Sequence, residues 1–433
     1  MSSRWICCQI GAREHYAVAR ALRRAKRPTE LYTDFWASQS VRSIASKSPV
    51  KFAQALAARF HHELIGDSEA GKGMSPAVSI HSWNMRSLAW EWGARRKSKA
   101  ASGGAYFGFI EVGKRFSIRV REALNQRTDL GADTILFAYD TGALETMEWC
   151  RARANGIKCV LNQMDPSRVE VDLVKAEAKL WPGWESQPVE VPEAYFQRRQ
   201  NEWALADRIV VNSEFSRKAL LQQGVSAHKL VVIPLCYETA ENRSDVEIGN
   251  QKGQDGLAKA GQPLRVLFLG QVILRKGIQY LMAAAKQLER ENIHFDVVGS
   301  IGISKEAIAS APRNMTFHGR TPRDQAAVWY RKSDVFVLPT LSDGFAITQL
   351  EAMAHGLPVV ATPCCGEVVT DGTDGFVVPA RDADALVKVF QRYLTSPQVL
   401  SDQSQAAHAK AKQFTVGRLA ENLVKLEAGL KDL

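Results

Sequence analysis

The feature that most constrains the fold is an alternation of short apolar runs with helical patterns, which occurs twice along the 433 residues. The first alternation opens with Trp5–Ile10, a glycine at Gly11 and a helical stretch, and it becomes regular from Thr134–Tyr139 onward. The second starts at Arg265–Leu269. Apolar, β-branched strands that alternate with helices are typical of parallel, doubly wound sheets. The sequence therefore predicts an α/β fold with two Rossmann-like sheets.

The remaining elements follow from apolar periodicity and capping residues. In the first part we expect His15–Arg27, Gly142–Ala154, Lys158–Gln163, Arg168–Trp181, Glu193–Ala206, Arg208–Val211, Glu214–Gln223 and Lys229–Pro234. In the second part we expect Ile278–Glu289, His294–Val298, Lys305–Ala309, Met315–His318, Asp324–Lys332, Val335–Pro339, Ile347–His355, Pro358–Thr362 and Gly375–Val378. From residue 28 to about 130 the pattern is irregular, with helices expected near Phe52–Arg59, Trp83–Lys97 and Phe107–Arg127.

A polar segment separates the two alternations. Residues Thr239–Pro263 have almost no apolar content, which is typical of a linker or surface loop. We expect an N-terminal domain over residues 1–238, this loop over 239–263, and a C-terminal domain over 264–433. The last helix either stays with the C-terminal domain or returns to the N-terminal one. Two such sheets leave a cleft at their facing carboxyl ends, where open α/β folds bind ligands.

Composition excludes several classes of protein. With 45% hydrophobic and 24% charged residues, the chain is neither disordered nor fibrous. It has no apolar run near the ~18 residues of a membrane-spanning helix, and Trp5–Ile10 is too short for a signal peptide. The seven cysteines form no Cys-x-x-Cys pair, which favours a reducing compartment. We therefore expect a cytoplasmic protein.

Positive charge is concentrated at one end. Residues 1–127 hold 22 Lys/Arg and 9 Asp/Glu, although the whole chain is only net +10. This end favours an anionic partner. Trp83, Trp90 and Trp92 alternate there with cations (Arg86, Arg95, Arg96 and Lys97), which fits either an interfacial helix at an anionic membrane or a helix with buried tryptophans. No nucleic-acid-binding module accompanies the charge, so we expect no nucleic acid.

The first candidate site is the turn from Gly270 to Gly277, between a strand and a helix. Its amides and the positive end of the following helix favour a phosphate, and the consecutive cations Arg275 and Lys276 can neutralise a diphosphate. The alternative is a loop with solvated charges.

The second candidate site holds two carboxylates. Asp343 and Glu351 are eight residues apart, slightly more than two helical turns, so a loop residue and a helix residue can border one pocket. A carboxylate can accept from sugar hydroxyls, or bind a ribose diol with both oxygens. The alternative makes Asp343 an N-cap and Glu351 a surface residue.

The third candidate site follows the strand that starts at Pro358 and ends in the turn at Gly366 and Glu367. Backbone amides of that turn can face a diphosphate or a sugar. Cys364 and Cys365 are interpreted as packing residues because no histidine or cation adjoins them in sequence.

Taken together, these motifs resemble the retaining nucleotide-sugar glycosyltransferases of the GT-B fold, the glycosyltransferases group 1 or family 4. The resemblance runs from about Asp207 to Tyr393. Its most specific parts are VVNSEFSRKAL (residues 210–220), the Arg275-Lys-Gly turn, and LPTLSDGFAITQLEAMAHGLP (residues 338–358).

The resemblance implies a role for each site residue. Lys276 and Arg275, with Gly270 and Gln271, would bind the diphosphate of a UDP- or GDP-sugar donor, and Glu351 would hold the ribose. Asp343, Gly344, Phe345 and Gly366 would lie against the transferred sugar. Gly11 would face the diphosphate or the acceptor from the other domain. Asp140 and Asp165 follow N-terminal strands and either orient the acceptor hydroxyl or cap helices.

Three positions depart from the family pattern. Gln271 stands where an Arg is frequent, Asp343 replaces the usual Glu, and Cys365-Gly366 replaces a frequent Gly-Gly. The first departure removes a fixed charge, and the second shortens the reach of a carboxylate by one methylene.

The expected function is transfer of a hexose from a nucleotide sugar to a glycan or lipid-linked acceptor in surface polysaccharide or glycolipid assembly. The resemblance implies retention of the anomeric configuration. Because no Asp-x-Asp or histidine cluster stands in a plausible metal-binding context, we expect no metal and no cofactor. The alternatives are a non-catalytic nucleotide-sugar-binding subunit and a GT-B phosphorylase or epimerase.

Overall fold

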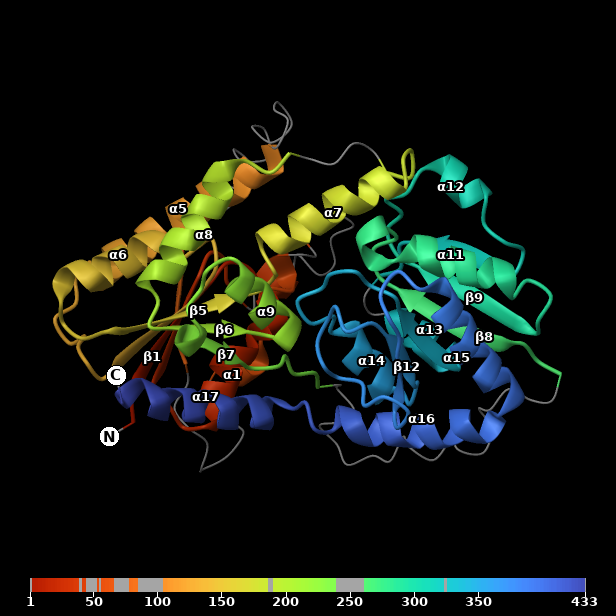
Figure 1. Ribbon diagram of the computed structural model, residues 1–433. Helices are drawn as coiled ribbons and strands as arrows, with labels where there is room; N and C mark the ends of the chain where they lie inside the picture. The colour runs from red at the N-terminus through yellow and green to blue at the C-terminus, as the bar shows by residue number, and fades with distance from the viewer. Residues whose placement is uncertain are drawn as a thin grey trace.

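The computed structural model describes residues 2–38, 41–43, 53, 56–65, 78–84, 104–185, 190–238, 261–322 and 325–432. Figure 1 shows two lobes side by side, each with a central sheet and covering helices. Both sheets are parallel throughout, which confirms the predicted fold class.

The N-terminal lobe has a seven-stranded sheet in the order β3-β2-β1-β4-β5-β6-β7. Its strands are β1 (Arg4–Gln9), β2 (Thr29–Thr33), β3 (Ser79–Ser82), β4 (Thr134–Tyr139), β5 (Lys158–Gln163), β6 (Arg208–Val211) and β7 (Leu230–Val232). The helices are α1 (Ala17–Arg24), α5 (Gly104–Asn125), α6 (Leu144–Arg153), α7 (Arg168–Leu180), α8 (Glu193–Leu205) and α9 (Glu214–Gln222). β1 and β4 are buried along nearly their whole length, as expected for central strands covered on both faces.

The C-terminal lobe has a six-stranded sheet in the order β10-β9-β8-β11-β12-β13. Its strands are β8 (Leu264–Leu269), β9 (Ile293–Val298), β10 (Met315–Gly319), β11 (Val335–Leu338), β12 (Val359–Ala361) and β13 (Gly375–Val377). Its helices are α11 (Ile278–Gln287), α12 (Lys305–Ala309), α13 (Ala326–Lys332), α14 (Thr348–Ala354), α15 (Ala383–Thr395) and α16 (Pro397–Ala411). The last helix, α17 (Val416–Lys431), packs on the core of the N-terminal lobe.

Each sheet has one topological switch point, where the winding reverses. It lies between β1 and β4 in the first sheet and between β8 and β11 in the second. Loops that leave two such strands diverge and open a crevice at the carboxyl edge of the sheet. The candidate residues near Gly11, Asp140, Lys276 and Asp343 all follow one of these four strands.

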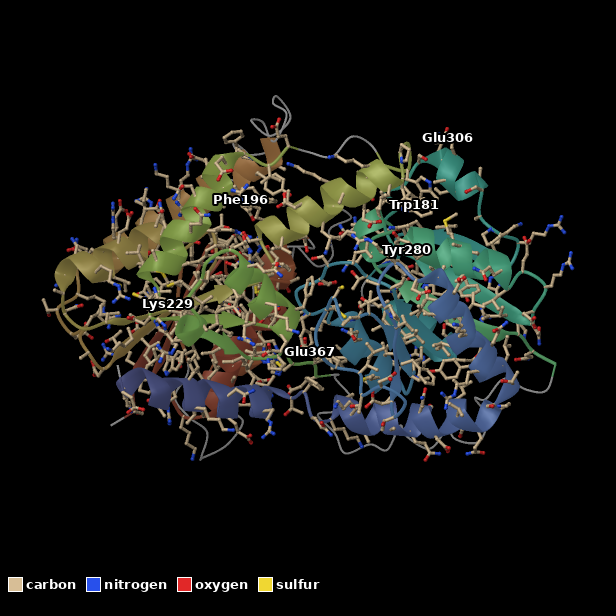
Figure 2. The ribbon with its side chains drawn as sticks, in the orientation of Figure 1. Trp181, Phe196, Lys229, Tyr280, Glu306 and Glu367 are labelled. Atoms are coloured by element: carbon tan, nitrogen blue, oxygen red, sulfur yellow. The ribbon has the colours of Figure 1, made fainter. Side chains whose placement is uncertain are left out.

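Helix α7 joins the lobes. It follows β5 of the N-terminal sheet, and beyond its end Trp181 packs edge-to-face on Tyr280 of α11, with ring centroids 5.9 Å apart (Figure 2). The fully buried carboxylate of Glu177 pairs with Arg381 and accepts hydrogen bonds from Gln279 (3.1 Å) and Tyr280 (3.0 Å). A helix of the first lobe is therefore anchored on the second by a buried polar cluster.

The C-terminal helices form a second connection between the lobes. Figure 1 shows α16 beneath the second sheet and α17 beneath the first. The carboxylate of Glu427 on α17 accepts from Arg27 Nε (2.6 Å) and from the backbone amide of Ser3 (2.8 Å). The end of the chain thus packs on the N-terminal lobe. Among the described helices, none has both the length and the apolar content needed to cross a bilayer.

One predicted element is wrong at its start, and the sequence analysis missed two strands, β2 and β3, and two helices, α15 and α16. The helix predicted from His15 begins at Ala17, because Glu14, His15 and Tyr16 adopt left-handed backbone angles. The fully buried Tyr16 ring, 5.2 Å from the ring of Trp36, packs the turn in place. Strands β2 and β3 lie in the region of irregular pattern. Glu30 interrupts the apolar run of β2, and its charge is compensated by Arg127 (2.6 Å).

Several predictions fall on residues outside the described ranges. These are most of the helices expected at Phe52–Arg59 and Trp83–Lys97, and the loop up to residue 260. Trp83 is described. Its ring meets that of Phe116 edge-on at 6.2 Å, beside the core of the first lobe.

Candidate active site

A cavity of about 790 Å³ lies where the two switch points face each other. The C-terminal lobe contributes Gly270, Gln271, Arg275, Lys276, Asp343, Phe345 and Glu351 to its wall. The N-terminal lobe contributes Glu14, His15, Arg20, Met164 and Asn212, among others. Seven of the sequence-predicted site residues therefore border one cavity.

The turn after β8 is held in shape by close backbone contacts. Residues Leu274–Lys276 form a single 3-10 turn that ends at Gly277, which has a φ of 76°. A side chain at Gly277 would be strained at this φ and would also overlap the carbonyl of Pro339. Glu185, from beyond α7, accepts a hydrogen bond from the Leu274 amide (2.5 Å). This packing places both cations of the turn on the cavity wall.

Both cations already have carboxylate partners. Lys276 forms an ion pair with Asp343, and Arg275 lies 3.3 Å from Glu170 of α7. Ser342 donates to the same Glu170 oxygen (2.9 Å). Burial raises the pKa of Glu170, although Arg275 opposes the rise. A bound diphosphate would therefore compete with two carboxylates for these cations.

Glu351 stands on α14, on the same cavity wall. Its carboxylate accepts a hydrogen bond from the Tyr330 hydroxyl (2.9 Å), and its backbone carbonyl lies 2.7 Å from Nδ1 of His355. The rings of Tyr330 and His355 stack at 5.1 Å. A carboxylate oriented by such neighbours can accept two hydrogen bonds from a diol.

Phe345 lines the cavity, whereas Gly344 and Gly366 lie beside it as packing positions. A Cβ at Gly366 would overlap the ring of Phe345. A Cβ at Gly344 would overlap the carbonyl of Met164 and lie 2.8 Å from the Asn212 amide nitrogen, both in the other lobe. The lobes therefore touch at Gly344, next to the ion-paired Asp343.

Gly344→Ala is expected to push the lobes apart and to lower any activity that needs the closed cavity. We expect about a tenfold or larger loss of turnover, because a small misplacement of reacting groups is costly. Small-angle scattering should show a larger radius of gyration. Gly429→Ala, in α17 with open space around it, is the control and should leave both quantities unchanged. Equal behaviour of the two variants would contradict this account.

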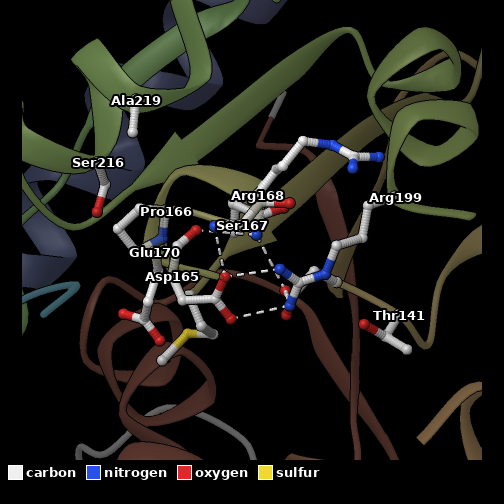
Figure 3. Close-up of polar contacts among 12 residues, drawn as sticks. Thr141, Asp165, Pro166, Ser167, Arg168, Glu170, Arg199, Ser216 and Ala219 are labelled. Atoms are coloured by element: carbon white, nitrogen blue, oxygen red, sulfur yellow. Dashed lines mark hydrogen bonds and ion pairs between the residues drawn. The ribbon is translucent and has the colours of Figure 1, made fainter. Parts of the chain in front are cut away.

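Asp140 and Gly11 border the N-terminal switch point but not the cavity. Asp140, 4% exposed, pairs with Arg199 (2.6 Å), which also binds Asp165 (2.6 Å), as Figure 3 shows for Asp165. The Gly11 amide donates to Asp34 (2.8 Å). Their roles toward an acceptor or a diphosphate stay predictions.

A histidine pair that the sequence analysis passed over lies near the cavity. Potential ligand atoms of His61, His62 and Glu63 lie within 4.8 Å of one another. The Glu63 carboxylate already pairs with Arg20 (2.9 Å) and Arg24 (3.0 Å). These ion pairs occupy the Glu63 carboxylate, which is the negatively charged ligand that a metal cation would need most.

All seven cysteines are free thiols. Cys236 borders the cavity, but burial raises the pKa of its thiol to about 12, so it offers no thiolate to the site. Cys365 is buried, and burial raises the pKa of its thiol well above the usual range. This agrees with the interpretation of Cys365 as a packing residue, since the thiolate is the reactive form.

Comparison with known structures identifies the architecture. HepE from Anabaena, solved with UDP, superimposes with a TM-score of 0.59 over 98% of this chain and 100% of that chain, at 15% identity. Sucrose-phosphate synthase from Thermosynechococcus elongatus superimposes with a TM-score of 0.58 over 99% of each chain, at 18% identity. The fold is GT-B.

The match to a family model lies in the C-terminal lobe of this GT-B chain. Residues 263–396 match the family model described as Glycosyl transferases group 1. The lipopolysaccharide core biosynthesis mannosyltransferase LpcC of Rhizobium leguminosarum bv. viciae is 28% identical over 179 residues, 37% of this chain and 50% of that protein.

A D-inositol 3-phosphate glycosyltransferase of Arthrobacter sp. (strain FB24) is 30% identical over 179 residues, 38% of this chain and 42% of that protein. The chain spans about half the length of the curated relatives it matches.

Sequence reasoning missed three residues that border the cavity, Glu14, Asn212 and Tyr330 beside Glu351. It also missed Glu170, the partner of Arg275. Asn212 lies within the VVNSEFSRKAL motif, so a signal for it was present. Glu170 meets Arg275 only through the packing of the two lobes. Tyr330 reaches Glu351 from α13 of the same lobe, 21 residues away along the chain.

Proposed function

We propose that this GT-B chain is a retaining, metal-independent hexosyltransferase that uses a nucleotide-sugar donor. The observation that carries the proposal is the single cavity bordered by Arg275, Lys276, Asp343 and Glu351. Two cations at a strand-to-helix turn suit a diphosphate, and a carboxylate on the neighbouring helix suits a ribose. HepE, which shares the fold, was solved with UDP.

Departure of a nucleoside diphosphate builds negative charge on its terminal phosphate. Lys276, Arg275 and the amides of the turn can stabilise that charge without a divalent ion. The bond between the anomeric carbon and the phosphate oxygen breaks, and the acceptor oxygen bonds to that carbon. The acceptor proton passes to the departing phosphate, so no protein nucleophile is required.

We propose a glycan or lipid-linked acceptor in surface polysaccharide or glycolipid assembly. One relative's name places it in lipopolysaccharide core biosynthesis. The basic first 127 residues favour peripheral contact with the inner face of the cytoplasmic membrane. Residues 1–238 would form the acceptor-side domain and residues 264–433 the donor domain. Flotation on anionic liposomes that is insensitive to charge reversal at Arg95, Arg96 and Lys97 would contradict membrane contact.

A thermal-shift screen of UDP-, GDP- and ADP-sugars tests the proposal. A donor at ~100 times its dissociation constant stabilises the chain by about 2.7 kcal/mol. Donor turnover is then followed with and without EDTA and should not change. The competing hypothesis, a non-catalytic subunit, draws on Gln271 and Asp343, which depart from the family pattern. Binding of a donor without turnover under any condition would favour that subunit.

Glu351→Ala is expected to weaken donor binding about 10- to 100-fold, the effect of losing charge-assisted hydrogen bonds to a diol. Calorimetric titration of the donor and of its nucleoside diphosphate measures the change. Tyr330→Phe removes only the bond that orients the carboxylate and should have a smaller effect. Equal affinity of Glu351→Ala and the unmodified chain for a donor would remove Glu351 from the site.

A further inference from the structure

The turn after β1 holds three consecutive non-glycine residues in the left-handed region. Glu14, His15 and Tyr16 have φ values of 51°, 50° and 59°. Such residues are held only where the surrounding structure determines them, and they cluster at functional sites. Here the buried Tyr16 fixes one end, and Gln9 fixes the other by donating to the Gly11 carbonyl (2.9 Å).

This turn presents Glu14 to the cavity without a strong partner. One carboxylate oxygen, Oε1, is shielded from water and accepts no hydrogen bond from any described residue. The other oxygen has the Tyr139 hydroxyl at 3.4 Å. By contrast, two other carboxylates of the cavity, Asp343 and Glu238, are both paired with cations. Glu14 is therefore the cavity carboxylate whose hydrogen bonds are least satisfied among these three.

The charge of the donor site limits what can bind beside Glu14. On the C-terminal wall of the cavity, the diphosphate would bind to Arg275 and Lys276, and the ribose would bind to Glu351. A second anion next to a carboxylate is repelled. The other oxygen of Glu14, Oε2, has the Tyr139 hydroxyl at 3.4 Å and can accept a further hydrogen bond, which a sugar or polyol hydroxyl in the cavity supplies.

We propose that Glu14 binds the acceptor, accepting a hydrogen bond from the hydroxyl that attacks the donor sugar. This inference rests on the proposed function and adds the residue that orients the second substrate. The backbone strain of residues 14–16 then serves to hold the carboxyl group at the cavity, on the wall opposite the phosphate-binding turn.

The protonation state of Glu14 supports this role. Burial raises its pKa to about 7, although Arg13 and the Tyr139 hydroxyl act to lower it. Other titratable groups near it are the Cys236 thiol, Arg20 and Glu238 around the same cavity. Near neutral pH the Glu14 carboxyl group exists in its ionised and its protonated form. The ionised form accepts a hydrogen bond from a hydroxyl group, and the protonated form can donate one.

Glu14→Gln tests the proposal, because it keeps the shape of the side chain and removes its charge. Nucleoside diphosphate release is measured with the donor found in the screen, in buffer alone and with methyl α-mannoside as a hydroxyl-bearing probe. The comparison uses whichever of the two conditions gives the faster release by the unmodified chain. At saturating donor, Glu14→Gln should lower that release about 10- to 100-fold. The dissociation constant for the donor should stay within twofold.

Stability separates this role from a structural one. Removing an unsatisfied buried carboxylate should leave the midpoint of thermal unfolding unchanged or raised. A carboxyl group whose pKa is raised by folding costs stability as pH rises from 4.5 to 7, so the advantage of Glu14→Gln should grow over that window. Glu421→Gln, an exposed carboxylate on α17, is the matched control and should change neither quantity.

Three outcomes overturn the proposal. Unchanged release by Glu14→Gln, with the donor still bound, removes Glu14 from acceptor binding and leaves the proposed function intact. A parallel loss of donor affinity moves Glu14 to the donor site. If the unmodified chain binds no donor and releases nothing in either condition, the proposed function fails, and the acceptor role fails with it.

Discussion

Lys276→Ala is expected to lower kcat/KM for the donor about 100- to 1000-fold. Lys276 lies just before α11 and can stabilise the negative charge that develops on the departing diphosphate. Loss of one preorganised group at such a position typically lowers the rate by this amount. The substitution also leaves Asp343 without its ion-pair partner, so a carboxylate would face the phosphates. Both effects act in the same direction, and the loss should appear in kcat as well as in donor affinity.

Two further variants sharpen this experiment. Lys286→Ala on α11 removes an exposed lysine, 66% exposed and paired with Glu289, and should leave kcat/KM unchanged. Lys276→Ala with Asp343→Asn removes both charges and should recover part of the loss if repulsion by Asp343 contributes. Steady-state release of nucleoside diphosphate measures all three. A loss below tenfold for Lys276→Ala would mean that the diphosphate is bound elsewhere.

The sequence predicted well wherever one physical rule acts locally. The strands around the two switch points are continuous apolar runs, because central parallel strands are covered on both faces. The turn at Gly277 could be recognised because its φ and the nearby Pro339 carbonyl leave room only for glycine. Seven predicted site residues lie on loops or helices that directly follow such strands, and for this reason they border one cavity.

The sequence predicted poorly wherever tertiary contacts overrule local preference. His15–Tyr16 has a helical pattern, but burial of Tyr16 against Trp36 accompanies a left-handed turn. Strand β2 carries a charge at its second residue, Glu30, that is compensated by Arg127, almost one hundred residues away. Glu170 was missed for the same reason, since its partner Arg275 belongs to the other lobe. No local pattern encodes such pairs.

The second large effect is expected in stability. Arg199→Met should lower the free energy of unfolding by about 3–5 kcal/mol at pH 7, the usual result of removing one partner from a buried ion pair. The Arg199 side chain is 3% exposed and binds Asp140 and Asp165, each at 2.6 Å. Methionine fills a similar volume, so the loss measures the missing charge beside the two carboxylates. Asp140 is buried and keeps only the longer contact with Arg13 (3.5 Å) among the described ion pairs, whereas Asp165 is 37% exposed. Urea unfolding measures the change.

The pH dependence gives the sign of the effect and a decisive control. Burial raises the pKa of Asp140 despite Arg199, and burial also acts to raise the pKa of Asp165, where Arg199 and backbone hydrogen bonds outweigh it. Without Arg199 both pKa values rise. A raised carboxyl pKa costs stability above the unfolded-state value of ~4 and costs nothing below it. The deficit of Arg199→Met should therefore be largest at pH 7 and shrink toward pH 4.

Adding Asp140→Asn and Asp165→Asn should recover most of the loss at pH 7. Arg418→Met, which removes an arginine 61% exposed, should change stability by less than about 0.5 kcal/mol. A deficit that does not vary with pH would show that packing of the side chain, rather than its charge, holds this part of the first lobe together.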